Sequence, residues 1–346
     1  MITASRITKV AFAAGTGATL LLAAMIFFGS GELSRFDAPL TAYAIATLFA
    51  AFGVTYRYAM WLQRPPTWRY FKAGWMLFLR PSRLVRNLGR FVVLLWEDIV
   101  AQRFIERRSV KRWLAHMGIA WGCILAFLIT FPLSWGWIQF LPASNATDYA
   151  VVVMGIPALT FDPHGWLGWV FFNWLNISAV LLLFGIGLAM HRRMFDRGAQ
   201  AVQSLGADFV PLFLLFSVAV TGLMLTASER LMAGSHFSFL SLLHAFTVVM
   251  LLLYLPFGKL FHVIQRPAQL GVAYYKEQGA RGPQQVCPRS GVAFHSQMHH
   301  DDLVATLHEV GYDFGAHQEL APEEKIRVFA LSQMAVLGEE GFVASA

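Results

Sequence analysis

Long uninterrupted apolar runs dominate the hydropathy pattern, and six of them are long enough for a helix to cross a bilayer, which needs roughly 20 residues. They cover about 8–29, 39–62, 112–139, 166–190, 208–226 and 239–264. Strands of an outer-membrane barrel would alternate apolar and polar residues, and the continuous runs exclude that pattern. The pattern therefore predicts an all-α integral membrane protein with six transmembrane helices.

The connection 63–111 mixes apolar and basic positions at helical spacing. Such a pattern is typical of helices that lie in the plane of the membrane interface. Two roles remain open for these interfacial helices: contact with lipid headgroups, or a docking surface for a cytosolic subunit.

Residues 268–346 are polar and predict a small cytoplasmic tail domain, with Gly279, Gly282 and Pro283 as a linker. The segments "HDDLVATLHEV" and "APEEKIRVFALSQMAVLGEE" predict its short helices. The expected organisation is an N-terminal transmembrane helix and loop (1–38), a five-span core that includes the interfacial helices (39–267), and this tail.

Composition and charge agree with a membrane protein and set its orientation. The chain is 57% hydrophobic and 14% charged, whereas a soluble domain carries about 25% charged residues. Twelve Lys or Arg residues lie in the 63–112 connection, so the positive-inside rule predicts both termini in the cytoplasm and a multi-pass protein of the inner membrane. The net charge of +7 therefore needs no nucleic-acid partner.

The two cysteines cannot hold an iron–sulfur cluster, which usually needs four thiolates, and they form no disulfide framework. Any iron–sulfur chemistry must belong to a partner. Cys287 lies with His295 and His299 in "QVCPRSGVAFHSQMHHDD", where either a zinc site or a docking segment would fit.

The last apolar run carries His244 and His262, eighteen residues apart. In one continuous helix this spacing is five turns, so both would face the same way, about 27 Å apart and one near each membrane face. A b-type haem takes an axial imidazole from each of two facing helices, and His116, at the start of the third run, matches the level of His262. The alternative is a set of interfacial histidines bonded to backbone or lipid.

His244 has no equally clear mate. His164 and His236 lie on its side of the membrane, whereas His191 lies at the opposite face, in a solvated helix end.

The run "LLHAFTVVMLLLYLPFGKLFHVIQRP" resembles the last span of the gamma subunit of respiratory nitrate reductase, a dihaem cytochrome b that oxidises quinol. The resemblance rests on both histidines, their spacing, the "PFGKLFH" run and the closing Pro267. "LAHMGIAWG" and "DFVPLFLLFSVAVTGLML" are similar to the second and fourth spans of that family. Related membrane cytochromes of heterodisulfide-reductase-type complexes share this core.

The resemblance implies that His116 and His262 hold the haem nearer the cytoplasm. It would also pair His244 with a histidine ten residues after His116, where this chain has Ala126. Either the outer haem is missing, or His244 takes another ligand such as His164, or its haem is bound unusually.

The function implied is a membrane-anchoring b-type cytochrome subunit of a respiratory oxidoreductase. It would pass electrons between ubiquinone or menaquinone and an iron–sulfur or catalytic subunit on the cytoplasmic face. It is an enzyme only as the quinol-linked subunit, with no substrate-reducing site of its own. The alternative is a haem-free anchor or scaffold for a cytoplasmic complex.

Two polar pairs of the predicted outer half have competing interpretations. Asp162 and His164 are candidate acid/base groups for quinol oxidation, or parts of a "DPHG" turn. Asn173 and Asn176 suit haem propionates, the ring N–H of a second ligand, or hydrogen bonds between helices.

Overall fold

The computed structural model describes residues 4–34, 38–143, 147–313 and 315–343. Residues 35–37 of the predicted outer loop and 344–346 of the predicted tail lie outside them. The α-helices are α1 Ala4–Gly29, α2 Ala38–Leu62, α3 Pro65–Phe78, α4 Leu84–Leu94, α5 Arg103–Glu106, α6 Val110–Ser134, α7 Trp166–Phe195, α8 Arg197–Val202, α9 Val210–Leu231, α10 Phe237–Tyr254, α11 His262–Gln265, α12 Gln269–Ala280, α13 Gln297–Glu309 and α14 Pro322–Val343.

The remaining helical turns are 3₁₀- and π-helices. The 3₁₀-helices are η1 Pro81–Arg83, η4 Lys259–Phe261, η5 Arg266–Ala268 and η6 Gly315–Glu319, and the π-helices are η2 Leu95–Val100 and η3 Leu205–Phe209.

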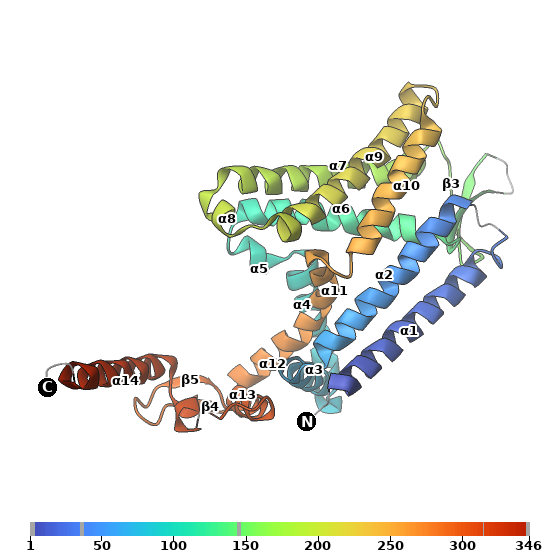
Figure 1. Cartoon of the computed structure of the whole chain (residues 1–346). Helices are drawn as coiled ribbons and strands as arrows, with labels where there is room; N and C mark the ends of the chain where they lie inside the picture. Colours follow the sequence, from blue (N-terminus) through green and yellow to red (C-terminus); the bar gives the residue numbers. More distant parts are fainter. Residues whose placement is uncertain (1–3, 35–37, 144–146, 314, 344–346) are drawn as a thin grey trace. The chain divides into compact units, whose positions relative to one another are not determined.

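The described chain forms two compact units, drawn in Figure 1. We call residues 4–60 and 95–266 the bundle unit, and residues 61–94 and 267–343 the tail unit. This division differs from the expected domain bounds in two ways. Helix α1 belongs with the bundle, because Gly15 lets the ring of Phe52 in α2 approach closely. The boundary between the two units falls after Leu94, inside the segment 63–111 that the sequence predicts to be interfacial. Residues 63–94 of this segment belong to the tail unit, and residues 95–111 belong to the bundle unit.

Five helices are long and apolar enough to cross a membrane: Ser5–Gly29, Val110–Ser134, Trp166–Phe195, Leu205–Leu231 and Phe237–Tyr254. They confirm a mostly helical chain suited to a lipid bilayer. Helix α2 is 25 residues long but is not among the five, and it carries Arg57. The sixth span therefore stays a prediction.

The last predicted span, 239–264, is not one helix, and this corrects the geometry expected for His244 and His262. Helix α10 ends at Tyr254, and the chain passes through a turn before η4 and α11. Pro256 has no N–H to continue the helix, and Gly258 is extended at φ −85°, ψ −173°. Whole turns of one helix therefore do not set the direction of the His262 side chain.

Small residues bring α6 and α7 together, and the two helices run side by side in Figure 1. A Cβ on Gly118 would lie 2.8 Å from the Cα of Gly185, and one on Gly122 would lie 2.7 Å from Leu182. Close backbone approach over small residues is typical of helix pairs in membranes. Helix α9 packs on α7 through a buried apolar cluster that includes Leu212 and Leu215.

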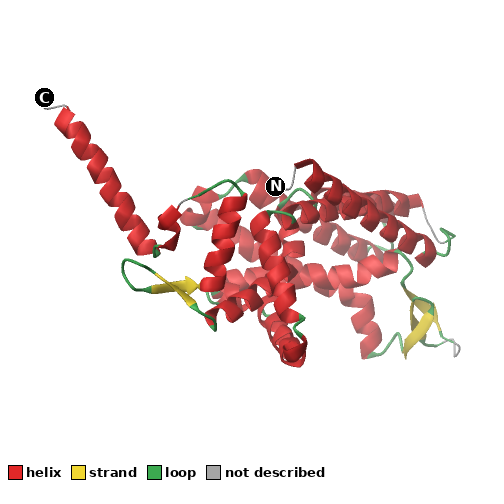
Figure 2. Ribbon diagram, turned by 90° about the horizontal axis from the view of Figure 1, so that it is seen from below, coloured by secondary structure: helices red, strands yellow, loops and turns green. Residues whose placement is uncertain are grey.

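Each unit also contains one small antiparallel sheet, drawn in yellow in Figure 2, which amends the all-α prediction. In the bundle unit, β1 Ile138–Pro142, β2 Tyr149–Val153 and β3 Ile156–Phe161 pair in sequence order. Their aromatic side chains pack on the start of α7, with Phe161 and Phe171 ring centres 5.0 Å apart. The sheet explains how a connection of more than thirty residues between two spans stays compact.

In the tail unit, α3 packs on α12 where Gly74 meets the backbone of Gly271. Arg90 of α4 forms an ion pair with Glu277 of α12. The strands β4 Gln284–Val286 and β5 Ala293–Ser296 lead into α13, and α13 and α14 confirm the two predicted tail helices. Gly279 is not a linker residue, because it is buried in the last turn of α12, where a Cβ would lie 2.6 Å from the Ser296 hydroxyl.

Candidate functional site

The bundle unit brings the rings of His116 and His262 close together. His116 lies in the second turn of α6, and His262 begins α11 after the turn that follows α10. Their ring centres are 6.2 Å apart with an interplanar angle of 64°. Both side chains are half-buried. These are the two residues that the sequence pairs, and the structure places them together although the helix expected to carry His262 has ended eight residues earlier.

Each ring is held through its Nδ1 atom by an oxygen that can only accept a hydrogen bond. His116 Nδ1 lies 2.6 Å from Oε1 of Gln102, and His262 Nδ1 lies 2.5 Å from the carbonyl oxygen of Lys259. A proton on each Nδ1 satisfies these oxygens and leaves Nε2 of the neutral ring with a free lone pair. Histidines that ligate metals almost always donate their second ring N–H in this way.

The distance between the two rings fits two axial ligands of one metal. A metal–imidazole bond is about 2 Å, and a ring nitrogen lies about 1 Å from its ring centre, so an ion held between two rings separates their centres by about 6 Å. The observed 6.2 Å agrees with that value. By this distance and by their anchored Nδ1 atoms, the two imidazoles are candidate ligands for a haem iron.

Arg57 of α2 fixes the turn that precedes His262. Its guanidinium donates to the carbonyl oxygens of Pro256 at 2.5 Å and Gly258 at 3.3 Å, and it stacks on the ring of Phe261 at 4.3 Å. A carbonyl at the end of a broken helix has no partner within the helix. Arg57 thus satisfies the orphaned groups and holds the short segment from which His262 projects.

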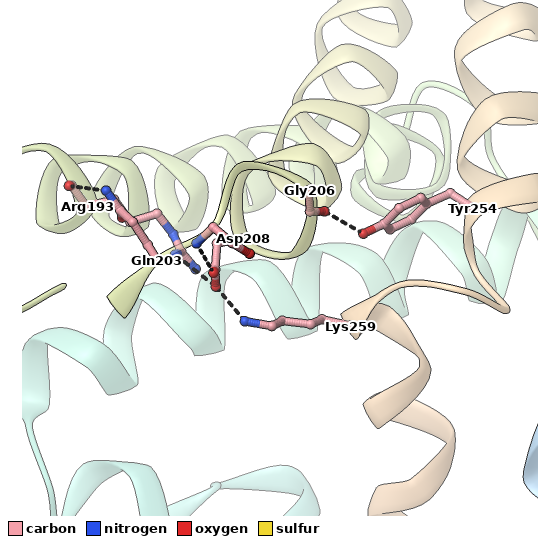
Figure 3. Close-up of polar contacts among 7 residues, drawn as sticks. Arg193, Gln203, Gly206, Asp208, Tyr254 and Lys259 are labelled. Carbon is pink, nitrogen blue, oxygen red and sulfur yellow. Dashed lines mark hydrogen bonds and ion pairs between the residues drawn. The ribbon is translucent and has the colours of Figure 1, made fainter. Parts of the chain in front are cut away.

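A second set of contacts, the Asp208 network of Figure 3, also holds this segment. Lys259 Nζ lies 2.7 Å from Asp208 Oδ1, and Arg193 Nη1 lies 3.2 Å from the same oxygen. The hydroxyl of Tyr254 donates to the carbonyl of Gly206 at 3.1 Å. The network joins the end of α7, the π-helix η3 and the turn before His262, so Lys259 is kept where its carbonyl can accept from the imidazole.

His244 lies in a polar cluster between α9 and α10. Its Nδ1 is 2.9 Å from the hydroxyl of Thr221, whose own proton goes to the carbonyl of Ser217 at 2.7 Å. Gly222 leaves room for the ring, because a Cβ there would lie 3.4 Å from His244 Cε1. This ring is therefore also anchored at Nδ1, with Nε2 available.

No second histidine contacts His244 within the part of the chain that the structure describes. His164 is exposed in the turn before α7, and the structure records neither a ring contact nor a hydrogen bond between it and His244. The mate of His244 therefore stays unassigned.

The other polar candidates, in the turn before α7 and in its first turns, have structural partners. The backbone N–H of His164 donates to Asp162 Oδ1 at 2.8 Å, which confirms the turn. Asn176 accepts from Thr226 at 2.9 Å and Asn173 accepts from Arg230 at 2.9 Å, so both asparagines of α7 bond to α9. Of the three interpretations, the interhelical hydrogen bond is the one observed.

In the tail unit, His295 lies with its ring centre 5.3 Å from that of His299 and 5.5 Å from that of His300. The hydroxyl of Tyr70 lies 2.9 Å from His299 Nδ1. Cys287 is buried in a separate apolar cluster with Leu320 and Ala321. Among the described residues, no group of three or more His, Cys, Asp and Glu side chains is arranged to hold a metal ion.

Comparison with family models, with curated proteins and with solved structures finds no match for this chain. The site is thus defined by its own geometry.

Sequence reasoning misses Arg57, Gln102 and Asp208, the three side chains that hold the histidines or the His262 segment. Arg57 has a signal, because an ionisable residue inside an apolar run of spanning length marks a functional or structural site. Gln102 has none, since neither its spacing from His116 nor its backbone conformation can be read from the chain.

Proposed function

We propose that this protein is a b-type cytochrome: a membrane-anchoring subunit that passes electrons between the quinone pool and an iron–sulfur partner subunit. The observation that carries the proposal is the close pair His116–His262, with both Nδ1 atoms anchored and the ring centres 6.2 Å apart. The resemblance of the last apolar run to the nitrate reductase gamma subunit supports the same function.

His116 and His262 would hold the haem through Nε2, and the haem would supply reversible one-electron transfer between its ferric and ferrous states. Gln102 and the Lys259 carbonyl keep the proton on Nδ1 of each ring. Arg57 and Asp208 hold the His262 segment in place. Oxidation of a quinol gives the quinone, two electrons and two protons, and Asp162 and His164 are the groups proposed to take up those protons.

The proposed topology has six spans with both termini in the cytoplasm, in a bacterial inner membrane, and α2 is the sixth span. Its single cation supports this assignment. A charge inside a membrane helix faces the bundle and pairs with backbone carbonyls or other charges, and Arg57 does so through Pro256 and Gly258. The iron–sulfur or catalytic partner would dock on the cytoplasmic side, near the His116–His262 pair.

Visible absorption of the purified protein tests the proposal. We expect the Soret and α bands of a low-spin b-type haem, and the loss of this signal in His116→Ala and in His262→Ala. His191→Ala is the matched control, because His191 is exposed near the end of α7 and its ring packs on Phe195, which lies in the same helix. A folded, colourless wild-type protein would overturn the proposal.

One observation favours the second candidate, a haem-free anchor or scaffold for a cytoplasmic complex. His244 shows the same anchored Nδ1 as the paired histidines but has no histidine opposite it among the described residues. An anchored ring can thus occur here without a facing ligand. Haem quantitation separates the candidates: about one or two haems per chain support the cytochrome, and none supports the scaffold.

A further inference from the structure

The short turn between η2 and α5 holds a glutamine in a backbone conformation that glutamine rarely adopts. Gln102 has φ 50° and ψ 43°, in the left-handed region, and only 7% of its surface is exposed. This conformation is unfavourable for a residue other than glycine, and it persists only where the surrounding structure holds it there. Its side chain reaches the ring of His116, where Gln102 Oε1 lies 2.6 Å from His116 Nδ1.

Two indoles of α6 hold the backbone next to Gln102. Trp113 Nε1 donates to the carbonyl of Ala101 at 2.7 Å, and Trp121 Nε1 donates to the carbonyl of Val100 at 3.3 Å. These tryptophans lie on either side of His116 along the helix. The helix that carries the histidine therefore also fixes the loop that carries the hydrogen-bond acceptor for it.

We propose that Gln102 is the positioning residue of His116: its amide oxygen sets the tautomer and ring orientation of the imidazole, and thereby tunes the haem ligand. The inference rests on the proposed function. The strained conformation, the burial and the two indole anchors all serve to place one neutral acceptor on Nδ1.

The chemical identity of the acceptor matters for the iron. A carboxylate on the ring N–H makes the imidazole a more basic ligand and stabilises the ferric state. A neutral amide does so less, and with no acceptor the ligand is least basic. The inference therefore predicts an order of reduction potentials: lowest for Gln102→Glu, higher for the wild type, and highest for Gln102→Gly.

Gln102→Gly is chosen because glycine adopts positive φ without strain, so the loop keeps its conformation while the acceptor is lost. Loss of the hydrogen-bond acceptor on a ligating histidine typically lowers metal affinity about 10–100-fold. We therefore expect Gln102→Gly to lose haem during dilution and Gln102→Glu to retain it. Size-exclusion elution and thermal melting of each protein report the fold independently of haem.

Redox titration of the full chain, with haem quantitation, is the test. The matched control is Gln139→Glu, which makes the same chemical change in β1, where the amide donates to the carbonyl of Gly136 at 2.9 Å and not to a histidine. If Gln102 had a purely structural role, Gln102→Glu and Gln102→Gly would shift the reduction potential in the same direction. That result would overturn the inference. Equal shifts in Gln102→Glu and Gln139→Glu would also overturn it.

The outcomes separate this inference from the function on which it rests. Haem in the wild type with unchanged potentials in both Gln102 variants sinks the positioning role alone. A wild-type protein without haem sinks both.

Discussion

The contact between α6 and α7 offers a sharp test of how His116 is held. Gly185 lies at the crossing, where a Cβ would lie 2.5 Å from the backbone nitrogen of Ile119 and 2.7 Å from the carbonyl oxygen of Ala115. His116 is the next residue after Ala115. Because the obstructing atoms are backbone atoms, no side chain can rotate away, and Gly185→Ala must push the helices apart.

The size of the effect follows from these distances. To reach an ordinary van der Waals separation of about 3.5 Å, the backbones must part by roughly 1 Å. Overpacking of this kind costs about 1–3 kcal/mol. For a chain of this size each kcal/mol lowers the melting temperature by about 2–4 °C, so Gly185→Ala should melt several degrees below the wild type.

Thermal unfolding in detergent, followed by circular dichroism, is the assay. The matched control is Gly187→Ala, two residues along the same helix, where a Cβ would meet no atom within 4 Å. This control should melt with the wild type or slightly above it, since alanine favours a helix by about 1 kcal/mol over glycine. If Gly185→Ala melts like Gly187→Ala, the close crossing is not a determinant of stability, and the reasoning is refuted.

Three further changes test other parts of the structure. Arg57→Met should destabilise by about 1.5–3 kcal/mol, because a charged donor to orphaned carbonyls is lost; a melting temperature no lower than that of Arg64→Met, an exposed control, would contradict this. Asn176→Leu removes the partner of Thr226 and should cost about 0.6 and at most about 1.7 kcal/mol, and a melting temperature equal to the wild type would show that the bond contributes nothing. Burial raises the pKa of Tyr275 above its ordinary 10.0, so the neutral phenol stabilises the fold below pH 10 and this stability is lost as the pH rises above 10. Tyr275→Phe should remove the part of the tyrosinate absorbance that appears at the highest pH. If the variant instead loses absorbance that appears near pH 10, the prediction is contradicted.

The helical architecture could be predicted because a membrane span depends on length and apolar composition, and both are written in the chain. Five of the six predicted runs correspond to helices of spanning length and hydropathy among the described residues. The remaining run, 39–62, is helix α2, which carries a cation inside it. The strands β1 to β3 could not be predicted with the same means. Each is only five or six residues long and is stabilised by pairing with its neighbours rather than by its own pattern.

The site was also predicted only in part. The expected pairing of His116 with His262 is observed, but the continuous helix from which the direction of the His262 side chain was inferred is not. The sequence pairs His116 with His262 by depth and by resemblance, and the two rings do lie close together. The argument from five whole helical turns fails, because α10 ends at Tyr254. The signal for the break was present in Pro256, which cannot donate to a helix, and it is the kind of signal that a spacing argument ignores.

The sequence by itself determined which segments are apolar enough to enter a bilayer, and which imidazoles are candidates for a metal. Both depend on residue type and local spacing. Only the tertiary structure decided which way the rings face and which oxygens accept from them, because Gln102, Arg57 and Asp208 are brought to the histidines by contacts between distant segments. The backbone next to the left-handed Gln102 is held by Trp113 and Trp121 of α6. No local preference of that residue could have predicted it.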